Sequence, residues 1–162
     1  MSPSLIGVPV LGCVDYRPQW FYPSPRGCRE EPFNYFYDIA NAPYALLAAS
    51  STQESIPLAI ETGSKFMWRG VRLNGDTTSL PVTLLVRFTD PFGNALSADY
   101  VPVIQYANPS GSAAGGLPVP MEPEIECPPG SFISVSFKNL DTSPVYLPDI
   151  TLYGLKRYEG AS

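Results

Sequence analysis

Histidine is absent from this sequence of 162 residues. Its absence removes the usual general base, the commonest zinc ligand and every serine–histidine or cysteine–histidine nucleophile. The sequence also lacks a Gly-x-Ser-x-Gly elbow and a dinucleotide-binding glycine motif. The stretch Thr62-Gly63-Ser64-Lys65 has no upstream glycine at the spacing of a phosphate loop. We therefore expect a protein that is not an enzyme and that holds no cofactor.

Charge is also scarce: charged residues make up 15% of the chain, against about a quarter in a typical domain. The net charge is −5, and the basic residues form no run that could follow a phosphate backbone. No segment approaches the roughly 20 apolar residues of a membrane helix, and none has the features of a signal peptide. We expect a soluble protein made in the cytoplasm, with neither nucleic acid nor membrane as partner.

Cysteine is limited to Cys13, Cys28 and Cys127, which have no metal-ligand spacing. An odd number argues against a closed set of disulfides. We expect free, buried thiols in a reducing compartment, with a Cys13–Cys28 bridge as the alternative.

Proline and glycine are abundant, with 19 and 13 copies, and they favour many short strands joined by turns. About eight strands are predicted after residue 43, and no stretch has helical periodicity. The clearest are residues 80–89, with Val82, Leu84, Val86 and Phe88 on one face, and residues 131–139, with Phe132, Val135 and Phe137 on one face. The other predicted strands are residues 44–50, 55–61, 65–73 with a bulge at Gly70, 95–106 with an edge or bend at Pro102, 123–127 and 150–158. This pattern predicts a two-sheet antiparallel sandwich, with a jelly roll as the favoured order.

Residues 1–43 differ in composition from the predicted sandwich at 44–162, because they combine seven prolines with eight aromatic residues. Such a segment is extended, and its rings need a surface to cover. It either wraps its own domain or lies on a neighbouring subunit, and residues 33–38 can also be read as the first strand of the body. The candidate partner-binding residues are Tyr16, Trp20, Phe21, Tyr22, Phe33, Tyr35, Phe36 and Tyr37.

Carboxylates offer the one remaining route to a chemical site. Glu122, Glu124 and Glu126 alternate along a predicted strand, which would place all three on one face. Such a cluster can bind calcium or serve as a glycosidase pair, but a solvated strand face is the more common reading. We expect no metal site. Trp20 and its neighbouring rings also suggest sugar stacking, with packing against protein as the alternative.

Four stretches of the later chain resemble a known family. They are residues 60–72 (IETGSKFMWRGVR), 86–90 (VRFTD) with the glycine turn and Leu96-Ser97 that follow, 128–133 (PPGSFI) and 152–158 (LYGLKRY). Together they resemble the small jelly-roll capsid decoration (cement) proteins of tailed bacteriophages, over about residues 55–158. The segment 1–43 is outside this resemblance.

The resemblance implies a structural protein on the outer surface of the virion. Its partners would be the major capsid protein and further copies of itself, as a dimer or trimer. An extended arm that bridges neighbouring subunits would stabilise the shell without catalysis. The alternative is a tail, fibre or other binding module that attaches to glycans on the host surface.

Overall fold

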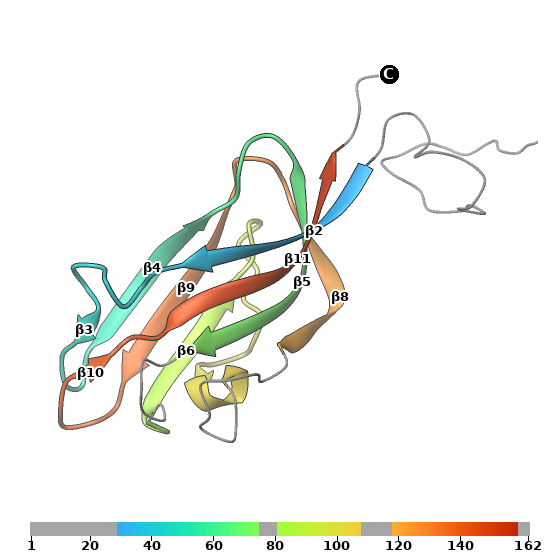
Figure 1. Ribbon diagram of the computed structural model, residues 1–162. Coiled ribbons are helices and arrows are strands. Elements are labelled where there is room, and N and C mark those ends of the chain that lie inside the picture. Colours follow the sequence, from blue (N-terminus) through green and yellow to red (C-terminus); the bar gives the residue numbers. More distant parts are fainter. Residues whose placement is uncertain (1–28, 75–80, 108–117, 159–162) are drawn as a thin grey trace, which may run out of the picture.

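The computed structural model describes residues 29–74, 81–107 and 118–158. They form two four-stranded antiparallel sheets and a small two-stranded sheet, which confirms the predicted antiparallel sandwich (Figure 1). The first sheet, called here the β11 sheet, has the order β2 (Arg29–Tyr37), β11 (Asp149–Tyr158), β5 (Lys65–Asn74) and β8 (Val119–Cys127). The second, the β9 sheet, has the order β4 (Thr52–Ala59), β9 (Phe132–Asn139), β6 (Leu84–Thr89) and β7 (Val101–Pro102). The small sheet pairs β3 (Leu46–Leu47) with β10 (Val145–Tyr146).

The chain changes sheet at nearly every connection. If the eight strands of the two large sheets are numbered along the chain, the β11 sheet reads 1-8-3-6 and the β9 sheet reads 2-7-4-5. Only the step from β6 to β7 stays within one sheet. Almost all strand contacts therefore join residues that are distant in sequence.

The core lies between the sheets and follows the alternation of the strands. In β6, Leu84, Val86 and Phe88 are buried, as predicted. Val82, expected on the same face, is instead exposed, because the Leu84 N–H donates to the carbonyl of Pro81 and the chain turns before the strand begins.

The inward face of β9 also differs from the prediction. Ile133, Val135 and Phe137 are buried, whereas Phe132 is exposed. Side chains alternate with a period of two, so Phe132 shares a face with the serines at 134 and 136 rather than with Val135. The prediction that grouped Phe132 with Val135 and Phe137 was wrong.

Two predicted strands are much shorter than expected. Residues 44–50 contribute only β3, and residues 95–106 contribute β7, a bridge from Ala95 to Thr89 and the 3₁₀ turn η2 (Val103–Tyr106). Pro102 lies in the edge strand β7, in agreement with the prediction, since proline has no N–H to donate to a further strand.

The middle of β5 carries the predicted bulge. Tyr153 pairs with Gly70 and Gly154 with Trp68, so Arg69 is an extra residue on β5. Gly154 permits close packing here, because a Cβ at this position would lie 2.0 Å from the carbonyl oxygen of Met67. Trp68 is fully buried, as expected of a central strand.

Candidate interaction surface

The eight candidate aromatic residues divide into two groups. Tyr16, Trp20, Phe21 and Tyr22 lie outside the described residues. The other four belong to β2, which pairs with β11 along its whole length and forms one edge of the sandwich. Residues 33–37 are therefore part of the first strand of the body, one of the two interpretations that the sequence left open. Phe33, Tyr35 and Tyr37 are turned toward the core, and Phe36 is 60% exposed.

Tyr35 joins the edges of the two sheets. Its ring meets Phe33 at 4.9 Å and Phe66 at 4.8 Å between centroids, both edge to face. Its hydroxyl accepts a hydrogen bond of 3.2 Å from the Glu61 N–H, just beyond β4. Burial raises the pKa of Tyr35, so the hydroxyl stays protonated at neutral pH.

Tyr37 makes a second link of the same kind. Its hydroxyl donates to the carbonyl of Ala59 at 2.7 Å, and burial raises its pKa. Both tyrosines therefore use their polar atoms within the domain. Phe36 is the one candidate ring of β2 that is mainly presented to the outside.

Lys156 is a buried cation within this aromatic cluster. Its Nζ lies 3.6 Å from the centroid of the Phe33 ring and forms an ion pair with Glu61. Burial acts to lower the pKa of Lys156, but the hydrogen bond and negative charge of Glu61 outweigh it and raise the pKa. A lysine held protonated cannot serve as a nucleophile or general base at neutral pH. This arrangement fastens β11 to the turn after β4.

This role of Lys156 was not predicted from the sequence. The signal was its position in β11, because Lys156 falls on the same alternating face as Ile150 and Leu152. A charged residue on a buried face requires a partner. Glu61, 95 residues away in sequence, could not be identified as that partner from local patterns.

The three glutamates of β8 do not form one cluster. In the ladder between β5 and β8, Trp68 is opposite Ile125 and Gly70 is opposite Pro120. The β8 residues between Pro120 and Ile125 are therefore outside the regular pairing, and their side chains do not simply alternate between the two faces. Glu124 pairs with Arg69, and Glu126 lies 3.3 Å from the Nζ of Lys65. Within the described ranges, no group of three or more potential ligands could hold a metal ion.

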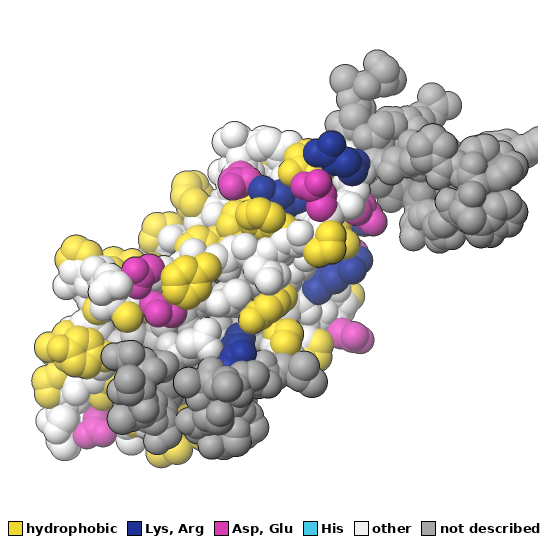
Figure 2. All heavy atoms as spheres, viewed as in Figure 1, with side chains coloured by type: hydrophobic (Ala, Val, Ile, Leu, Met, Phe, Trp, Pro, Cys, Tyr) yellow, Lys and Arg dark blue, Asp and Glu magenta, His cyan; other side chains and the backbone are white. Residues whose placement is uncertain are grey.

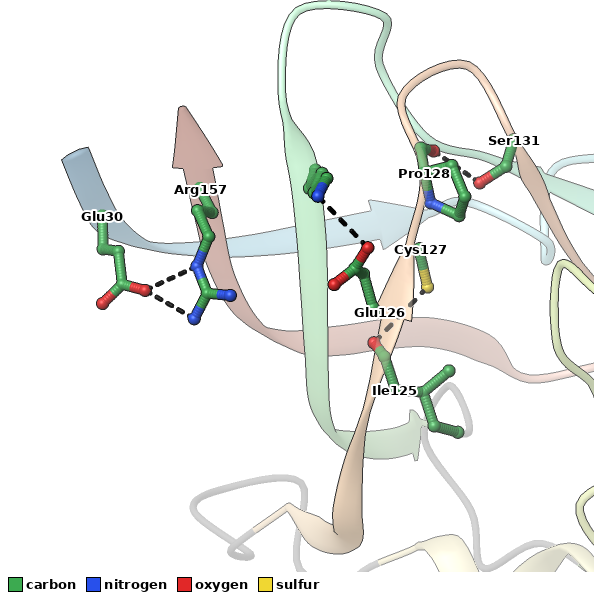
Figure 3. A network of polar contacts seen from close by, with 8 residues as sticks. Glu30, Ile125, Glu126, Cys127, Pro128, Ser131 and Arg157 are labelled. Carbon is green, nitrogen blue, oxygen red and sulfur yellow. Dashed lines mark hydrogen bonds and ion pairs between the residues drawn. The ribbon is translucent and has the colours of Figure 1, made fainter. Parts of the chain in front are cut away.

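Paired charges gather at the end of the sandwich where β2 begins and β11 ends, here called the charged end. Arg157 and Glu30 form an ion pair of 2.7 Å, and Arg29 lies 4.3 Å from the centroid of the Tyr158 ring. Figure 3 shows the Glu30–Arg157 pair beside β5 and β8, with Glu126 turned toward β5. The acidic and basic side chains here neutralise one another.

Large apolar side chains occupy the opposite end, here called the apolar end. It is defined by Leu46 (52% exposed), Val82 (64%), Leu140 (53%) and Tyr146 (67%). Leu46 and Tyr146 are direct partners across β3 and β10, so they share a face. The Leu140 N–H donates to the carbonyl of Thr83, the residue that follows Val82. Figure 2 shows hydrophobic side chains where Figure 1 places β3 and β10, and others spread over the rest of this face.

Asn139 supports the apolar end from beneath. It is fully buried, and its Nδ2 lies 3.3, 3.1 and 2.9 Å from the carbonyl oxygens of Leu47, Ala48 and Ser143. Its Oδ1 accepts from the Asp141 N–H at 2.9 Å. One side chain thus joins the segments that carry Leu46, Leu140 and Tyr146.

Cys127 lies at the end of β8 and is a free, buried thiol, as expected. Burial raises its pKa to about 12, which suppresses the reactive thiolate. Cys13 and Cys28 lie outside the described residues, so the possible bridge between them stays a prediction.

Comparisons with protein-family models, with curated proteins and with solved structures found no match. Among the described residues, no helix has the length and apolar character needed to cross a membrane.

Proposed function

We propose that this protein is a decoration protein of a tailed-bacteriophage capsid, built on a jelly roll. In this proposal it binds the outer surface of the head and stabilises the shell by bridging subunits of the major capsid protein. The observation that carries the proposal is the strand order.

The strand order is that of one long antiparallel ribbon folded over on itself. Strand 1 pairs with strand 8, 2 with 7, 3 with 6 and 4 with 5, in the numbering of the two large sheets. Wrapping such a ribbon into two sheets gives the eight-stranded double Greek key of a jelly roll. The sequence stretches that resemble decoration proteins lie from the end of β4 to the end of β11 in this arrangement.

The surface of the described residues also suits adhesion to protein. The ring-to-ring contacts that we find lie among the inward aromatic residues and η2, whereas the apolar end leaves four large side chains uncovered. Stable protein interfaces bury about 1,200–2,000 Å² in total, with an apolar centre and a polar rim. The apolar end has the composition of such a centre.

A sedimentation experiment with heads of the virus that encodes the protein tests this function. The intact chain is mixed with purified, DNA-filled heads, and the bound protein is quantified in the pellet. We expect saturable binding at a fixed ratio to the major capsid protein and a higher temperature of DNA release. If the intact chain stays in the supernatant and instead binds a glycan array saturably, the host-attachment alternative replaces our proposal.

A truncated chain that lacks residues 1–28 tests what this N-terminal segment contributes to binding. The truncation ends at residue 28, because β2 supplies Tyr35 to the core and Ile39 follows it there. We expect residues 29–162 to retain the circular dichroism of the sandwich and to bind heads more weakly. Equal binding by the intact and the truncated chain would show that the N-terminal segment does not contribute to the binding of heads.

A further inference from the structure

The apolar end is a preformed surface rather than a loose group of loops. Leu46 and Tyr146 are fixed by the pairing of β3 with β10, and Asn139 ties both segments to the end of β9. Binding to a preformed surface avoids the entropy of ordering it. The described residues leave this surface uncovered, so it can accept an occupant of matching chemistry.

The chain itself contains such an occupant. Trp20, Phe21 and Tyr22 are consecutive aromatic residues, preceded by Pro18 and followed by Pro23. Proline restricts the backbone before any contact is made, which lowers the entropy lost on binding. Each aromatic side chain can bury about 150–250 Å². Three rings with their backbone therefore supply a large part of a stable interface.

The length of the connecting chain disfavours a contact between these rings and the apolar end of their own chain. The segment joins the sandwich at Arg29, which pairs with Tyr158 at the last residue of β11. The ten residues of β11 span about 30 Å at a rise of about 3.3 Å per residue. Tyr146 lies beyond the other end of β11, as Figure 1 shows for β10.

Tyr22 is seven residues before Arg29 and reaches at most about 25 Å. Phe21 reaches about 29 Å, and Trp20 reaches about 32 Å only if the chain is fully extended along a straight line. All three rings could therefore contact Tyr146 of the same chain only with the segment almost fully extended, which costs conformational entropy. A second copy has no such limit.

We propose that the apolar end binds residues 20–22 of a second copy of this chain. Leu46, Val82, Leu140 and Tyr146 form the receiving surface, and the three rings are the inserted group. The contact joins the N-terminal segment of one molecule to the opposite end of the next. It is a property of the isolated protein and does not depend on the proposed binding to capsids.

Photocrosslinking in a mixture of two labelled chains tests the contact. One preparation of the intact chain carries p-benzoylphenylalanine in place of Trp20 and is labelled with ¹⁵N; the other is unlabelled and has the native residue. After irradiation, mass spectrometry locates each crosslink and assigns its two ends to the heavy or light chain. We expect crosslinks from position 20 of the heavy chain to the segments around Leu46, Leu140 and Tyr146 of the light chain.

The double variant Leu46→Asp with Tyr146→Asp in the receiving chain should lower this crosslink yield by at least about tenfold, the factor that corresponds to about 1.4 kcal/mol. Phe92→Asp is the matched control, since Phe92 is 65% exposed and follows the opposite end of β6. Its yield should stay unchanged. Crosslinks confined to single chains, crosslinks to other surfaces, or an undiminished yield in the double variant would each overturn the proposal.

Discussion

At the charged end, Glu30 and Glu126 each have a basic partner within the chain, whereas at the apolar end the four large side chains are each more than half exposed. Exposed ion pairs contribute little net free energy, about 0–1 kcal/mol, and a neutralised patch has little remaining attraction for another charged surface. Burial of exposed apolar area, in contrast, stabilises a complex by about 25 cal/mol per Å². The comparison indicates that the apolar end, rather than the more highly charged one, is the surface that gains from a partner.

The largest effect should come from Gly154, in the half of β11 that lies nearer the charged end. Gly154→Ala places a Cβ 2.0 Å from the Met67 carbonyl oxygen and 2.9 Å from the Phe66 ring. The strands must separate, and we expect a loss of about 3 kcal/mol or more in the free energy of unfolding, measured by urea denaturation. Gly63→Ala, whose Cβ would meet nothing within 4 Å, is the control and should change stability by less than about 0.5 kcal/mol. Equal stability of the two variants would contradict the close approach.

Asn139 should give the next largest effect, this time beneath the apolar end. Asn139→Ala leaves buried carbonyl groups and the Asp141 N–H without this partner, and we expect a loss of about 2–4 kcal/mol. Hydrogen exchange should show faster opening of β3 and β10 than of β5. The exposed Asn41, whose amide donates to the carboxylate of Asp38, provides the control Asn41→Ala. If exchange at β3 and β10 is unaffected, Asn139 does not hold the apolar end in place.

The Lys156–Glu61 pair should have a smaller effect, with an asymmetry between its partners. Glu61→Gln leaves a buried lysine without its carboxylate, and we expect a loss of about 1–2 kcal/mol, a reduced value because Glu61 is half exposed. Lys156→Met should be milder, since the remaining Glu61 is hydrated and methionine keeps the contact with Phe33. Denaturation curves of both variants measure the difference. A greater loss for Lys156→Met would show that packing of the lysine stem, rather than its charge, is the main contribution.

The same pair predicts a dependence on pH. The pKa of Lys156 is raised in the folded protein, so its contribution is fully present below the usual lysine value of 10.5 and is lost as pH rises through the higher folded value. Ionisation of Tyr35 and Tyr37 also lowers the stability of the folded protein at alkaline pH, because their pKa values in the folded state are raised above 10. The informative quantity is therefore the stability difference between the native chain and Glu61→Gln. It should be constant from pH 7 to about pH 10 and shrink above it.

The sequence carried enough local information to predict the sandwich. Leu84, Val86 and Phe88 alternate inward, and Asp90 stabilises the turn after β6 by accepting hydrogen bonds from the N–H groups of Phe92 and Asn94. Phe132 was misassigned although the information was present: it is two residues before Ser134 and so shares its face.

The sequence carried less information about the surface. In β2 the alternation of Phe33, Tyr35 and Tyr37 was obscured by the prolines around it, so the change of composition near residue 43 does not mark the start of the sandwich. The apolar end depends on the pairing of Leu46 with Tyr146, 100 residues apart. Local periodicity shows which residues are outward but not which outward residues meet.

The smallest effect on stability should come from variants that distinguish the two ends by association alone. Leu46→Asp at the apolar end and Glu30→Gln at the charged end both change exposed side chains, and each should alter the free energy of unfolding by less than about 0.5 kcal/mol.

The sedimentation of the two variants should differ. Leu46→Asp places a charge at the centre of an apolar contact and should shift the protein toward a smaller species in analytical ultracentrifugation at equal concentration, because a desolvated carboxylate without a partner opposes binding. Glu30→Gln removes half of an exposed ion pair and should leave the sedimentation coefficient unchanged. If Glu30→Gln dissociates the protein and Leu46→Asp does not, the charged end is the associating surface and the contrast drawn here is reversed.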